Sequence, residues 1–349
     1  MSLPTIRAGI VAYGHIAQKY HAPLLNALPC FELTKVLERH HRFAERDYPR
    51  VESVQTMDEL LADENLDLIV ITTPNQFHFA QAKAALEAGK HVVLEKPFTV
   101  SAIEANMLEH IAQAEGKLLS VFHNRRWDGD FKTIQKIINS GMLGELVEFE
   151  SRFDRFIGEQ REKYWREDDV PGAGVLYDLG PHLIDQALTL FGMPKRLFAD
   201  IRKQRADSQV DDYFDIVFYY ERLKVRLKAG NLVKELQPRF VMHGTKGSFT
   251  KYGLDEQKNT LINPTNLSKP DWGKENPQHW GKLNAQLGDL HISGQVETLA
   301  GSYHDYYQDV YRAITHDKQP IVSAKDGRLS IELIELAFQS SQKMSVLTL

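Results

Sequence analysis

Cysteine is almost absent from this chain, since Cys30 is the only one among 349 residues. One thiol cannot form an internal disulfide or build a cysteine-based zinc site, so we expect a reducing, cytoplasmic environment. Long apolar runs are also missing. No stretch approaches the roughly 20 residues that span a bilayer, and no basic-then-apolar leader precedes Pro4. We therefore expect no association with a membrane.

An excess of charge of one sign is lacking as well. Lysine and arginine number 42 against 47 aspartate and glutamate residues, which gives a net charge of −5. No basic stripe interleaved with aromatic residues occurs, so nucleic acid is not an expected partner. The composition, 42% apolar and 26% charged, is typical of a folded globular protein. The length exceeds what one hydrophobic core usually holds and predicts two domains.

Strand-like and helical segments alternate through the first third of the chain. Helical spacing occurs at 76–88 and 102–115, between short apolar runs that are typical of buried strands. These runs are 6–11, 31–37, 68–72, 91–94 and 117–122. The alternation predicts an α/β domain with a doubly wound parallel sheet over residues 1–122.

The first strand turns into the first helix through residues 12–17. Ala12, Gly14 and Ala17 occupy the three glycine positions of the dinucleotide-binding fingerprint. Gly14 is kept where the backbone must approach a pyrophosphate, whereas Ala12 departs from the fingerprint and predicts a slightly different turn. We predict a Rossmann domain here; a tight strand–helix turn without a nucleotide is the alternative. The predicted contacts are Ala12, Tyr13, Gly14, His15 and Ile16.

The second strand ends in the charged run 38–42, where the ribose of a bound dinucleotide lies in such domains. Glu38 suits the ribose hydroxyls of NAD, and Arg39 suits the 2′-phosphate of NADP. Two arginines and two histidines in the run favour NADP, with NAD as the alternative. The same pattern is also typical of a solvated segment that opens a helix.

The strand 68–72 is followed by a further group of predicted cofactor contacts, Thr73, Pro74, Asn75 and His78. Asn75 suits either of two roles, to cap the next helix or to contact the cofactor. His78 lies one turn on, at a position more typical of a helix surface than of a ligand.

Glu95-Lys96-Pro97 follows the strand 91–94 directly. Pro97 prevents the chain from continuing as a regular ladder. Ligands of open α/β sheets bind outside the carboxyl ends of the strands, so Lys96 is placed to hydrogen-bond a reacting oxygen. An ordinary surface lysine is the alternative.

The pattern changes after Phe122, and we predict a second domain over residues 123–349. A helix is predicted over 131–139, and alternating apolar runs follow at 147–156, 214–220, 225–229 and 239–243. They predict a mostly antiparallel sheet with one packed and one open face. An open sheet face often packs against the same face of a second copy of the chain, so we expect a homodimer or homotetramer formed through this sheet.

Asp178 and His182 lie four residues apart in a helical pattern that also contains Pro181. This spacing puts a carboxylate and an imidazole on one helix face, and such a pair can accept a proton near neutral pH. A helix-stabilising surface pair is the alternative. No metal is expected, because no third ligand stands at a suitable spacing. The segment 164–166 precedes this helix and is interpreted as a lid over the cofactor or as packed aromatics.

With residues 12–17, Glu95-Lys96-Pro97 and Asp178…His182 in this order, the chain resembles the glucose–fructose oxidoreductase / inositol dehydrogenase family (Gfo/Idh/MocA). The resemblance covers nearly the whole chain. Segments 123–128, 165–166 and 176–180 are similar to the branch of NADP-dependent scyllo-inositol 2-dehydrogenases. The resemblance implies an N-terminal Rossmann domain and a C-terminal α+β domain with a large, mostly antiparallel open sheet.

The resemblance also implies an NAD(P)-dependent dehydrogenase acting on CH–OH groups of a cyclic polyol or sugar, with scyllo-inositol as the model substrate. Lys96 would hydrogen-bond the reacting hydroxyl and the nicotinamide ribose, His182 would accept the proton, and Asp178 would orient both partners. Further predicted cofactor contacts are Glu95, Lys96, Trp165 and Arg166. The predicted substrate contacts are Lys96, Asn124, Arg125, Arg152, Asp154, Asp178, His182, Tyr306 and Tyr307. The alternatives are a non-catalytic NAD(P)- and sugar-binding sensor and an aldose or dihydrodiol dehydrogenase.

Overall fold

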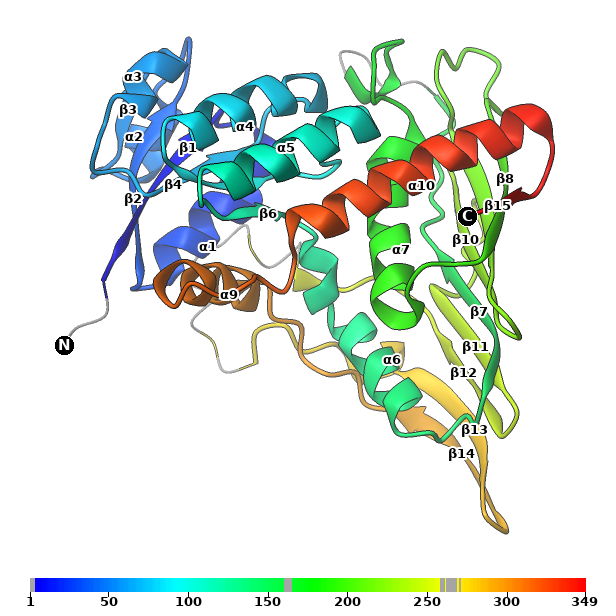
Figure 1. Cartoon of the computed structure of the whole chain (residues 1–349). Helices are drawn as coiled ribbons and strands as arrows, with labels where there is room; N and C mark the ends of the chain where they lie inside the picture. Colours follow the sequence, from blue (N-terminus) through cyan, green and yellow to red (C-terminus); the bar gives the residue numbers. More distant parts are fainter. Residues whose placement is uncertain (1–3, 160–164, 258–260, 262–268, 270) are drawn as a thin grey trace. The chain divides into compact units, whose positions relative to one another are not determined.

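The computed structural model describes residues 4–159, 165–257, 261, 269 and 271–349. The chain forms two compact units (Figure 1). Unit 1 comprises residues 1–124, 257–272 and 302–331; unit 2 comprises residues 125–256, 273–301 and 332–349. The division into domains at residue 122 stays a prediction, and two segments of the last third belong to unit 1. None of the described helices combines the length and apolar character that a membrane span requires.

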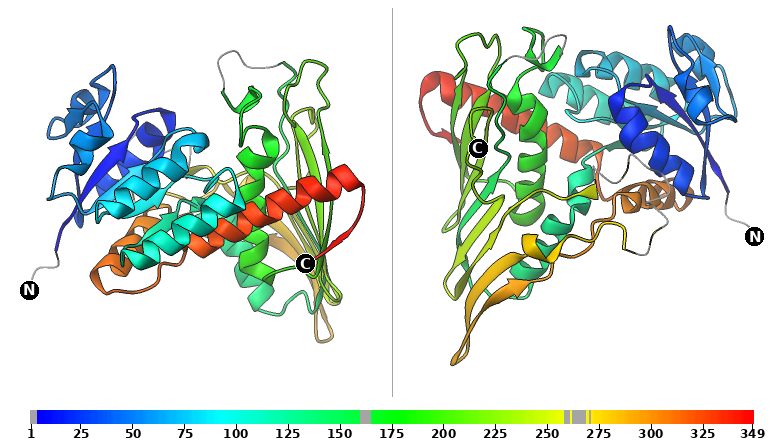
Figure 2. Two further views of the ribbon diagram at one scale, coloured as in Figure 1. Left: turned by 45° about the horizontal axis from the view of Figure 1, so that its top comes forward. Right: turned by 180° about the vertical axis from the view of Figure 1, so that it is seen from behind.

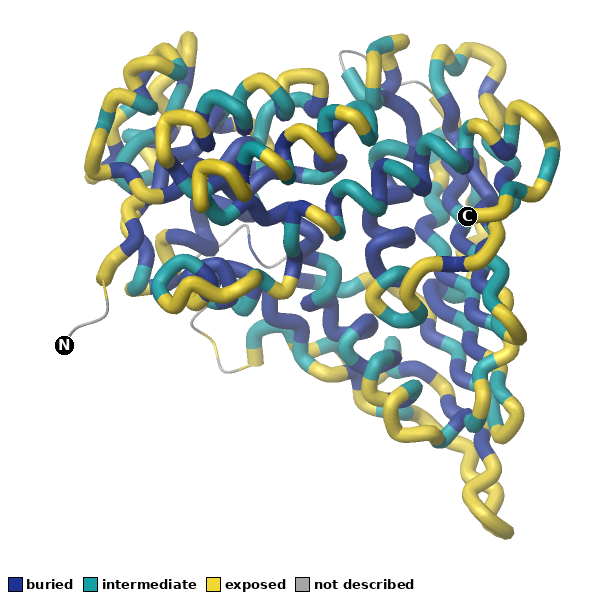
Figure 3. The backbone as a smooth tube through the Cα atoms, viewed as in Figure 1, coloured by how far each residue is buried: buried dark blue, intermediate teal, exposed yellow. Residues whose placement is uncertain are grey.

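Unit 1 is built on a sheet of six parallel strands in the order β3-β2-β1-β4-β5-β6. The strands are β1 Ile6–Val11, β2 Phe31–Leu37, β3 Glu52–Val54, β4 Leu68–Ile71, β5 His91–Leu94 and β6 Leu119–Val121. All four residues of β4 are buried, as expected for a parallel strand covered on both faces (Figure 3). The predicted doubly wound parallel sheet is confirmed.

Helices cover both faces of this sheet. Figure 1 shows α4 and α5 on one face, and the reverse view in Figure 2 shows α1 on the other. The helical segments are η1 Ala17–His21, α1 Ala22–Ala27, α2 Phe43–Asp47, α3 Met57–Leu61, η2 Asn75–Phe77, α4 His78–Glu87, α5 Ala102–Ala114 and α9 His304–Thr315. Segment η1 is a single π-helical turn, a form often found at functional sites. Helix α9 returns from the last part of the chain, which the sequence pattern did not predict.

Unit 2 contains a sheet of nine strands in the order β14-β13-β12-β11-β7-β10-β9-β8-β15. Among the described strands of this sheet, only β7 and β10 pair in parallel, and the other pairs are antiparallel. The strands are β7 Leu146–Arg152, β8 Arg196–Arg202, β9 Tyr213–Tyr219, β10 Lys224–Gly230, β11 Phe240–Gly244, β12 Gly247–Lys251, β13 Gly281–Leu287, β14 Leu290–Val296 and β15 Leu347–Thr348. The mostly antiparallel sheet is confirmed.

One face of this sheet packs against helix α7, Val175–Phe191. Phe149 of β7 and Phe191 of α7 meet edge to face, with ring centroids 5.2 Å apart. Side chains of β7 alternate, so Phe149 and Ser151 are buried while Glu148, Glu150 and Arg152 lie half-buried on the opposite face. The remaining helical segments are η3 Asn124–Trp127, α6 Gly129–Asn139, η4 Trp165–Glu167, η6 Pro277–His279 and α10 Ala324–Lys343, which begins in unit 1 and ends in unit 2.

Candidate active site

The turn after β1 is fixed by hydrogen bonds from both neighbouring strands. Ala12 N donates to Leu37 O at 3.2 Å, and Thr72 Oγ1 donates to Val11 O and Ala12 O at 3.1 and 2.9 Å. Ala12 has a φ of 70°, in the left-handed region that glycine adopts without strain and other residues occupy at about 1–2 kcal/mol. The alanine at position 12 predicted a turn different from that of the glycine fingerprint, but Ala12 adopts the backbone conformation that glycine has there.

Gly14 is exposed at the next position of the fingerprint. A Cβ atom built on it would meet nothing within 4 Å, and its φ is not left-handed. Neither the packing nor the backbone conformation therefore requires glycine at this position. The open space above the backbone fits a pyrophosphate, which must approach the main chain closely in a dinucleotide-binding turn.

At the end of β2, Glu38 is buried and its carboxylate accepts three hydrogen bonds within the unit. It accepts hydrogen bonds from Phe43 N, Ala44 N and Ser53 Oγ at 3.2, 2.9 and 3.2 Å. A cavity of about 410 Å³ opens beside it. The lining residues are Glu38, Arg39, His40, His41, Arg42, Ser53 and Gln55. Arg39 and Arg42 thus give the cavity two guanidinium groups.

The residues after β4 connect two loops at the carboxyl edge of the sheet. His78 is buried, not on the helix surface as its position predicted. Its ring nitrogens lie 2.9 Å from Pro97 O and 2.9 Å from Thr73 O, so the ring holds the β4 loop to the β5 loop. Burial lowers the pKa of His78. Asn75 is the first residue of η2, and the N-cap position before it is occupied by Pro74, which has no side-chain group to cap the turn. The predicted capping role of Asn75 is therefore wrong.

Lys96 lies two residues beyond the end of β5, and its peptide bond to Pro97 is cis. Its backbone N–H donates to Glu95 Oε2 at 2.9 Å. Glu95 is buried, and its second oxygen lies 3.0 Å from Nε2 of His21, a residue that sequence reasoning missed. No pattern in the sequence links positions 21 and 95, because they meet only where η1 packs against the end of β5 in the folded unit.

In unit 2, the helix that carries Asp178 and His182 begins at Val175, against Asp211. The Asp211 backbone oxygen accepts from Val175 N at 2.8 Å, and its Oδ2 accepts from Leu176 N at 2.7 Å. Gly174 has a φ of 96°, and a Cβ there would lie 2.1 Å from Asp211 Oδ1, so only glycine fits this approach. Burial raises the pKa of Asp211 to about 7.

Asp178 lies between two guanidinium groups. Arg155 Nη2 lies 3.3 Å from its Oδ2, and Arg166 Nε lies 3.4 Å from its Oδ1. Arg155 also donates to Asn231 Oδ1 at 2.8 Å, which holds it to the residue directly after β10. The Arg166 guanidinium lies over the Trp165 ring at 4.6 Å, so the predicted lid residues belong to the surroundings of Asp178. Tyr164 lies outside the described residues.

His182 is buried one turn further along α7, beside Phe153 at 6.3 Å between ring centroids. The guanidinium groups of Arg125 and Arg239 lie over the same Phe153 ring, at 4.6 and 4.5 Å. Gln186 accepts from Arg239 Nη2 at 2.9 Å and donates to Arg125 O at 3.0 Å. Sequence reasoning missed Phe153, Arg239 and Gln186. Of these three residues, only Gln186 could have been found from the sequence, because it follows His182 by four residues and so shares its face of the helix.

Four predicted substrate contacts lie elsewhere; one of them, Tyr307, is buried in unit 1, with its hydroxyl 2.6 Å from His21 Nδ1. Arg152 and Asp154 alternate with Phe153 and face the side of the sheet away from α7, where Arg152 pairs with Glu150 at 2.6 Å. Burial raises the pKa of Asp154 on that face. Tyr306 is buried in unit 1, and its hydroxyl lies 2.8 Å from Ser120 Oγ. These positions depend on strand register and on the path of α9, which the local pattern does not reveal.

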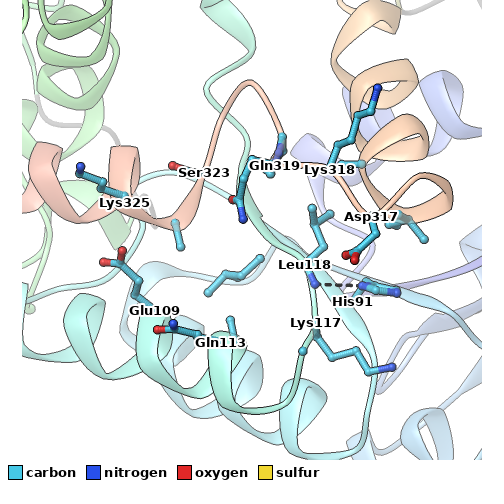
Figure 4. A pocket seen from close by; sticks show the side chains of 17 residues that line it. His91, Glu109, Gln113, Lys117, Leu118, Asp317, Lys318, Gln319, Ser323 and Lys325 are labelled. Carbon is cyan, nitrogen blue, oxygen red and sulfur yellow. Dashed lines mark hydrogen bonds between the residues drawn. The ribbon is translucent and has the colours of Figure 1, made fainter.

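A cavity of about 520 Å³ lies at the opposite edge of the unit 1 sheet. It opens at the amino ends of β5 and β6, beside the C-terminal part of α9, as Figure 4 shows. His91 Nδ1 accepts from Leu118 N at 2.9 Å at its wall, and burial lowers the pKa of His91 to about 4. Ligands of open α/β sheets bind at the other edge, so this cavity is not the candidate site.

A parallel sheet with a nucleotide-type turn and a second unit that carries an imidazole beside ion-paired groups together define a dinucleotide-dependent enzyme. Residues 6–123 match the family model "Oxidoreductase family, NAD-binding Rossmann fold", and residues 135–349 match its "C-terminal alpha/beta domain". The chain belongs to the Gfo/Idh/MocA oxidoreductase family. As a member of this family, it is an NAD(P)-dependent dehydrogenase acting on alcohols.

Relatives resemble the chain over its whole length. It is 41% identical over 344 residues to the uncharacterized oxidoreductase YdgJ of Escherichia coli, covering 99% of both chains. It is 36% identical to scyllo-inositol 2-dehydrogenase (NADP(+)) IolW of Bacillus subtilis, covering 99% of this chain and 96% of the relative. The solved structure of the oxidoreductase yvaA from Bacillus subtilis superposes with a TM-score of 0.96 at 36% identity, covering 100% of this chain and 99% of that one.

Proposed function

We propose that the protein transfers a hydride between NADP and a secondary alcohol or ketone of a cyclic polyol or sugar of the scyllo-inositol type. The similarity to IolW over the whole chain carries this substrate class. The groups around Phe153 support it, because the guanidinium donors of Arg125 and Arg239 and the imidazole of His182 suit a ring of hydroxyls. A bound nicotinamide dinucleotide supplies the hydride chemistry.

The preference for NADP over NAD rests on the end of β2. The Glu38 carboxylate already accepts hydrogen bonds from two backbone N–H groups and Ser53, so only Oε1, which accepts one of the three, has an acceptor position left for a ribose hydroxyl. The exposed Arg39 lines the adjoining cavity and would meet a 2′-phosphate there. Residues 12–16 would hold the pyrophosphate.

In the proposed roles, Lys96 hydrogen-bonds the reacting hydroxyl and His182 accepts its proton. Asp178, held by Arg155 and Arg166, keeps a fixed negative charge one helical turn from the imidazole. A positioned acid or base contributes roughly 10²- to 10⁴-fold in rate. Substitution of Lys96 or His182 is therefore expected to lower turnover more than it lowers the affinity for the cofactor.

The decisive experiment follows NADPH absorbance with a panel of inositols, aldoses and dihydrodiols, using NAD and NADP in parallel. Turnover of a ring polyol with NADP is expected, and Lys96→Ala and His182→Ala are expected to lose most of it while still binding NADPH. Lys83→Ala, on the exposed face of α4 and paired with Glu87, is the matched control. Near-native turnover in both site variants would refute the roles. Cofactor binding without turnover of any compound would favour a sensor.

We also propose that the open face of the nine-stranded sheet joins two copies of the chain. This face carries complementary pairs on neighbouring strands, such as Lys224 with Glu148 at 2.7 Å and Arg226 with Asp215. Val217 and Phe198 form a half-buried apolar pair among them. In a two-fold symmetric dimer this face of one copy would lie against the same face of the other.

A further inference from the structure

Three polar side chains meet in the interior of unit 1, behind the segment that carries Lys96. His21 Nε2 lies 3.0 Å from Glu95 Oε1, and His21 Nδ1 lies 2.6 Å from Tyr307 Oη. The side chains of His21 and Tyr307 are fully inaccessible to solvent, and Glu95 is nearly so. They come from η1, from the end of β5 and from α9, so they are distant in sequence.

The carboxylate of Glu95 is held at both oxygens. Burial raises its pKa, but the hydrogen bond from His21 and the nearby charge of Lys96 outweigh burial, so the pKa of Glu95 lies below its usual value. An ionised carboxylate only accepts hydrogen bonds. His21 Nε2–H therefore donates to Oε1, and the backbone N–H of Lys96 donates to Oε2.

Tyr307 completes the chain of hydrogen bonds. Burial and the neighbouring Tyr306 and Glu95 raise the pKa of Tyr307 well above its usual value, so its hydroxyl stays protonated and shares a hydrogen bond with His21 Nδ1. Its ring packs edge to face on Phe31 of β2, at 5.6 Å between centroids. Through this hydrogen bond, Tyr307 of α9 fixes the orientation of the His21 imidazole.

His21 is also the last residue of the π-helical turn that follows the dinucleotide turn 12–16. The chain Tyr307–His21–Glu95–Lys96 therefore links the element after the nucleotide turn to the backbone of the motif lysine. Buried networks whose members are all satisfied rigidify the groups that they connect.

We propose that Glu95, His21 and Tyr307 are positioning residues that hold the Lys96 backbone in its working place through this chain of hydrogen bonds. The inference rests on the proposed role of Lys96. None of the three residues needs to touch the substrate; they act through Lys96.

Tyr311 supplies a matched control on the same helix. It lies one turn beyond Tyr307, packs on the same Phe31 ring at 5.9 Å, and its hydroxyl donates to Pro4 O at 2.9 Å. Tyr311→Phe and Tyr307→Phe each remove one hydroxyl with one hydrogen bond from the same helix. Only Tyr307→Phe breaks the chain to Lys96.

The first measurement is amide hydrogen exchange on the full chain without added substrate. Tyr307→Phe is expected to speed exchange in the peptide that contains the Lys96 N–H, whereas Tyr311→Phe leaves that peptide unchanged. This readout does not depend on turnover. Equal exchange at Lys96 in both variants would overturn the proposal.

The second measurement compares kcat, NADPH affinity and melting temperature. Tyr307→Phe is expected to lower kcat about 10- to 100-fold, because small misplacements of a reacting group have effects of that size. NADPH affinity is expected to stay within about twofold of the parent, and the melting temperature to fall no more than in Tyr311→Phe, which keeps kcat. Equal kcat in the two variants contradicts the inference.

Glu95→Gln provides a further readout that a merely structural residue would not move. The amide removes the negative charge beside Lys96, so the alkaline limb of the kcat profile is expected to shift to lower pH. An unshifted profile argues against the link to Lys96. Lys96→Ala separates the hypotheses: retained turnover in that variant refutes the proposed function, whereas its loss together with a normal Tyr307→Phe refutes only this inference.

Discussion

Asp211 accepts a hydrogen bond from the backbone N–H of Leu176 at 2.7 Å, in the first turn of the helix that carries Asp178 and His182. The carboxylate is buried beside Asp212, whose charge adds to the effect of burial and raises the pKa of Asp211 to about 7. The other charged groups around it are Arg155, Arg166, Glu167, Asp178 and Arg205. The anchor of this helix therefore changes its charge near neutral pH.

Stability is expected to depend on pH through this residue. Because the folded-state pKa lies above the ordinary value of 3.8, the folded protein holds a proton that the unfolded chain releases. The resulting stabilisation is complete below about pH 4 and is lost as pH rises to about 7. In urea unfolding at several pH values, the stability of the parent relative to Asp211→Asn should fall over this range. A constant difference between the two proteins would contradict the raised pKa.

Gly14→Val is expected to abolish dinucleotide binding without unfolding the protein. A Cβ at Gly14 meets nothing within 4 Å, so the free energy of unfolding should change by less than about 0.5 kcal/mol. The side chain would occupy the space proposed for the pyrophosphate. NADPH fluorescence titration and urea unfolding measure the two effects. Gly294→Val, at another glycine with open space in β14, is the control and should bind normally; a normal affinity of Gly14→Val would exclude this turn as the cofactor site.

Arg39→Ala is expected to weaken NADPH binding about tenfold and NADH binding far less. The reason is the loss of one charge-assisted hydrogen bond to a 2′-phosphate, worth about 1.5–3 kcal/mol before solvent screening. Titrations with both reduced cofactors measure the ratio. Arg46→Ala removes a nearby exposed guanidinium that is paired with Asp47, and should change neither affinity. Equal losses for NADH and NADPH would show that Arg39 does not discriminate between them.

Val217→Glu is expected to shift the oligomer towards the monomer. It adds a carboxylate to the apolar pair of Val217 and Phe198 on the open face of the sheet, where a second copy would bury it. Light scattering after size-exclusion chromatography gives the mass of each species. Ile103→Glu changes a more exposed apolar residue on α5 and should leave the mass unchanged. A monomeric parent protein would rule out the proposed dimer.

Local patterns predicted much of unit 1. The strand β5 ends at Leu94, directly before Glu95-Lys96-Pro97, because an apolar run followed by proline defines a strand end within a few residues. The antiparallel strands β8, β12, β13, β14 and β15 were missed. On β14 apolar residues alternate at Leu290, Ile292 and Val296, but nearly every residue of the strand is exposed (Figure 3), so this alternation marks no packed face.

The candidate site was predictable only where one element carries the information. Asp178 and His182 share a helix, so their common face followed from their spacing. The chain from Tyr307 through His21 to Glu95 and the approach of Arg239 to Phe153 did not follow from any pattern. Each depends on segments that are distant in sequence.

By itself the sequence determined the fold class, the order of the two domain types and the strand ends that carry the motif residues, because periodicity and turn residues act over a few positions. Only the tertiary structure decided which face of β7 carries Arg152, and that α9 returns to unit 1 with Tyr306 and Tyr307 buried. Strand register and long-range packing set these positions, and a shift of one residue in register reverses the face of every side chain on a strand.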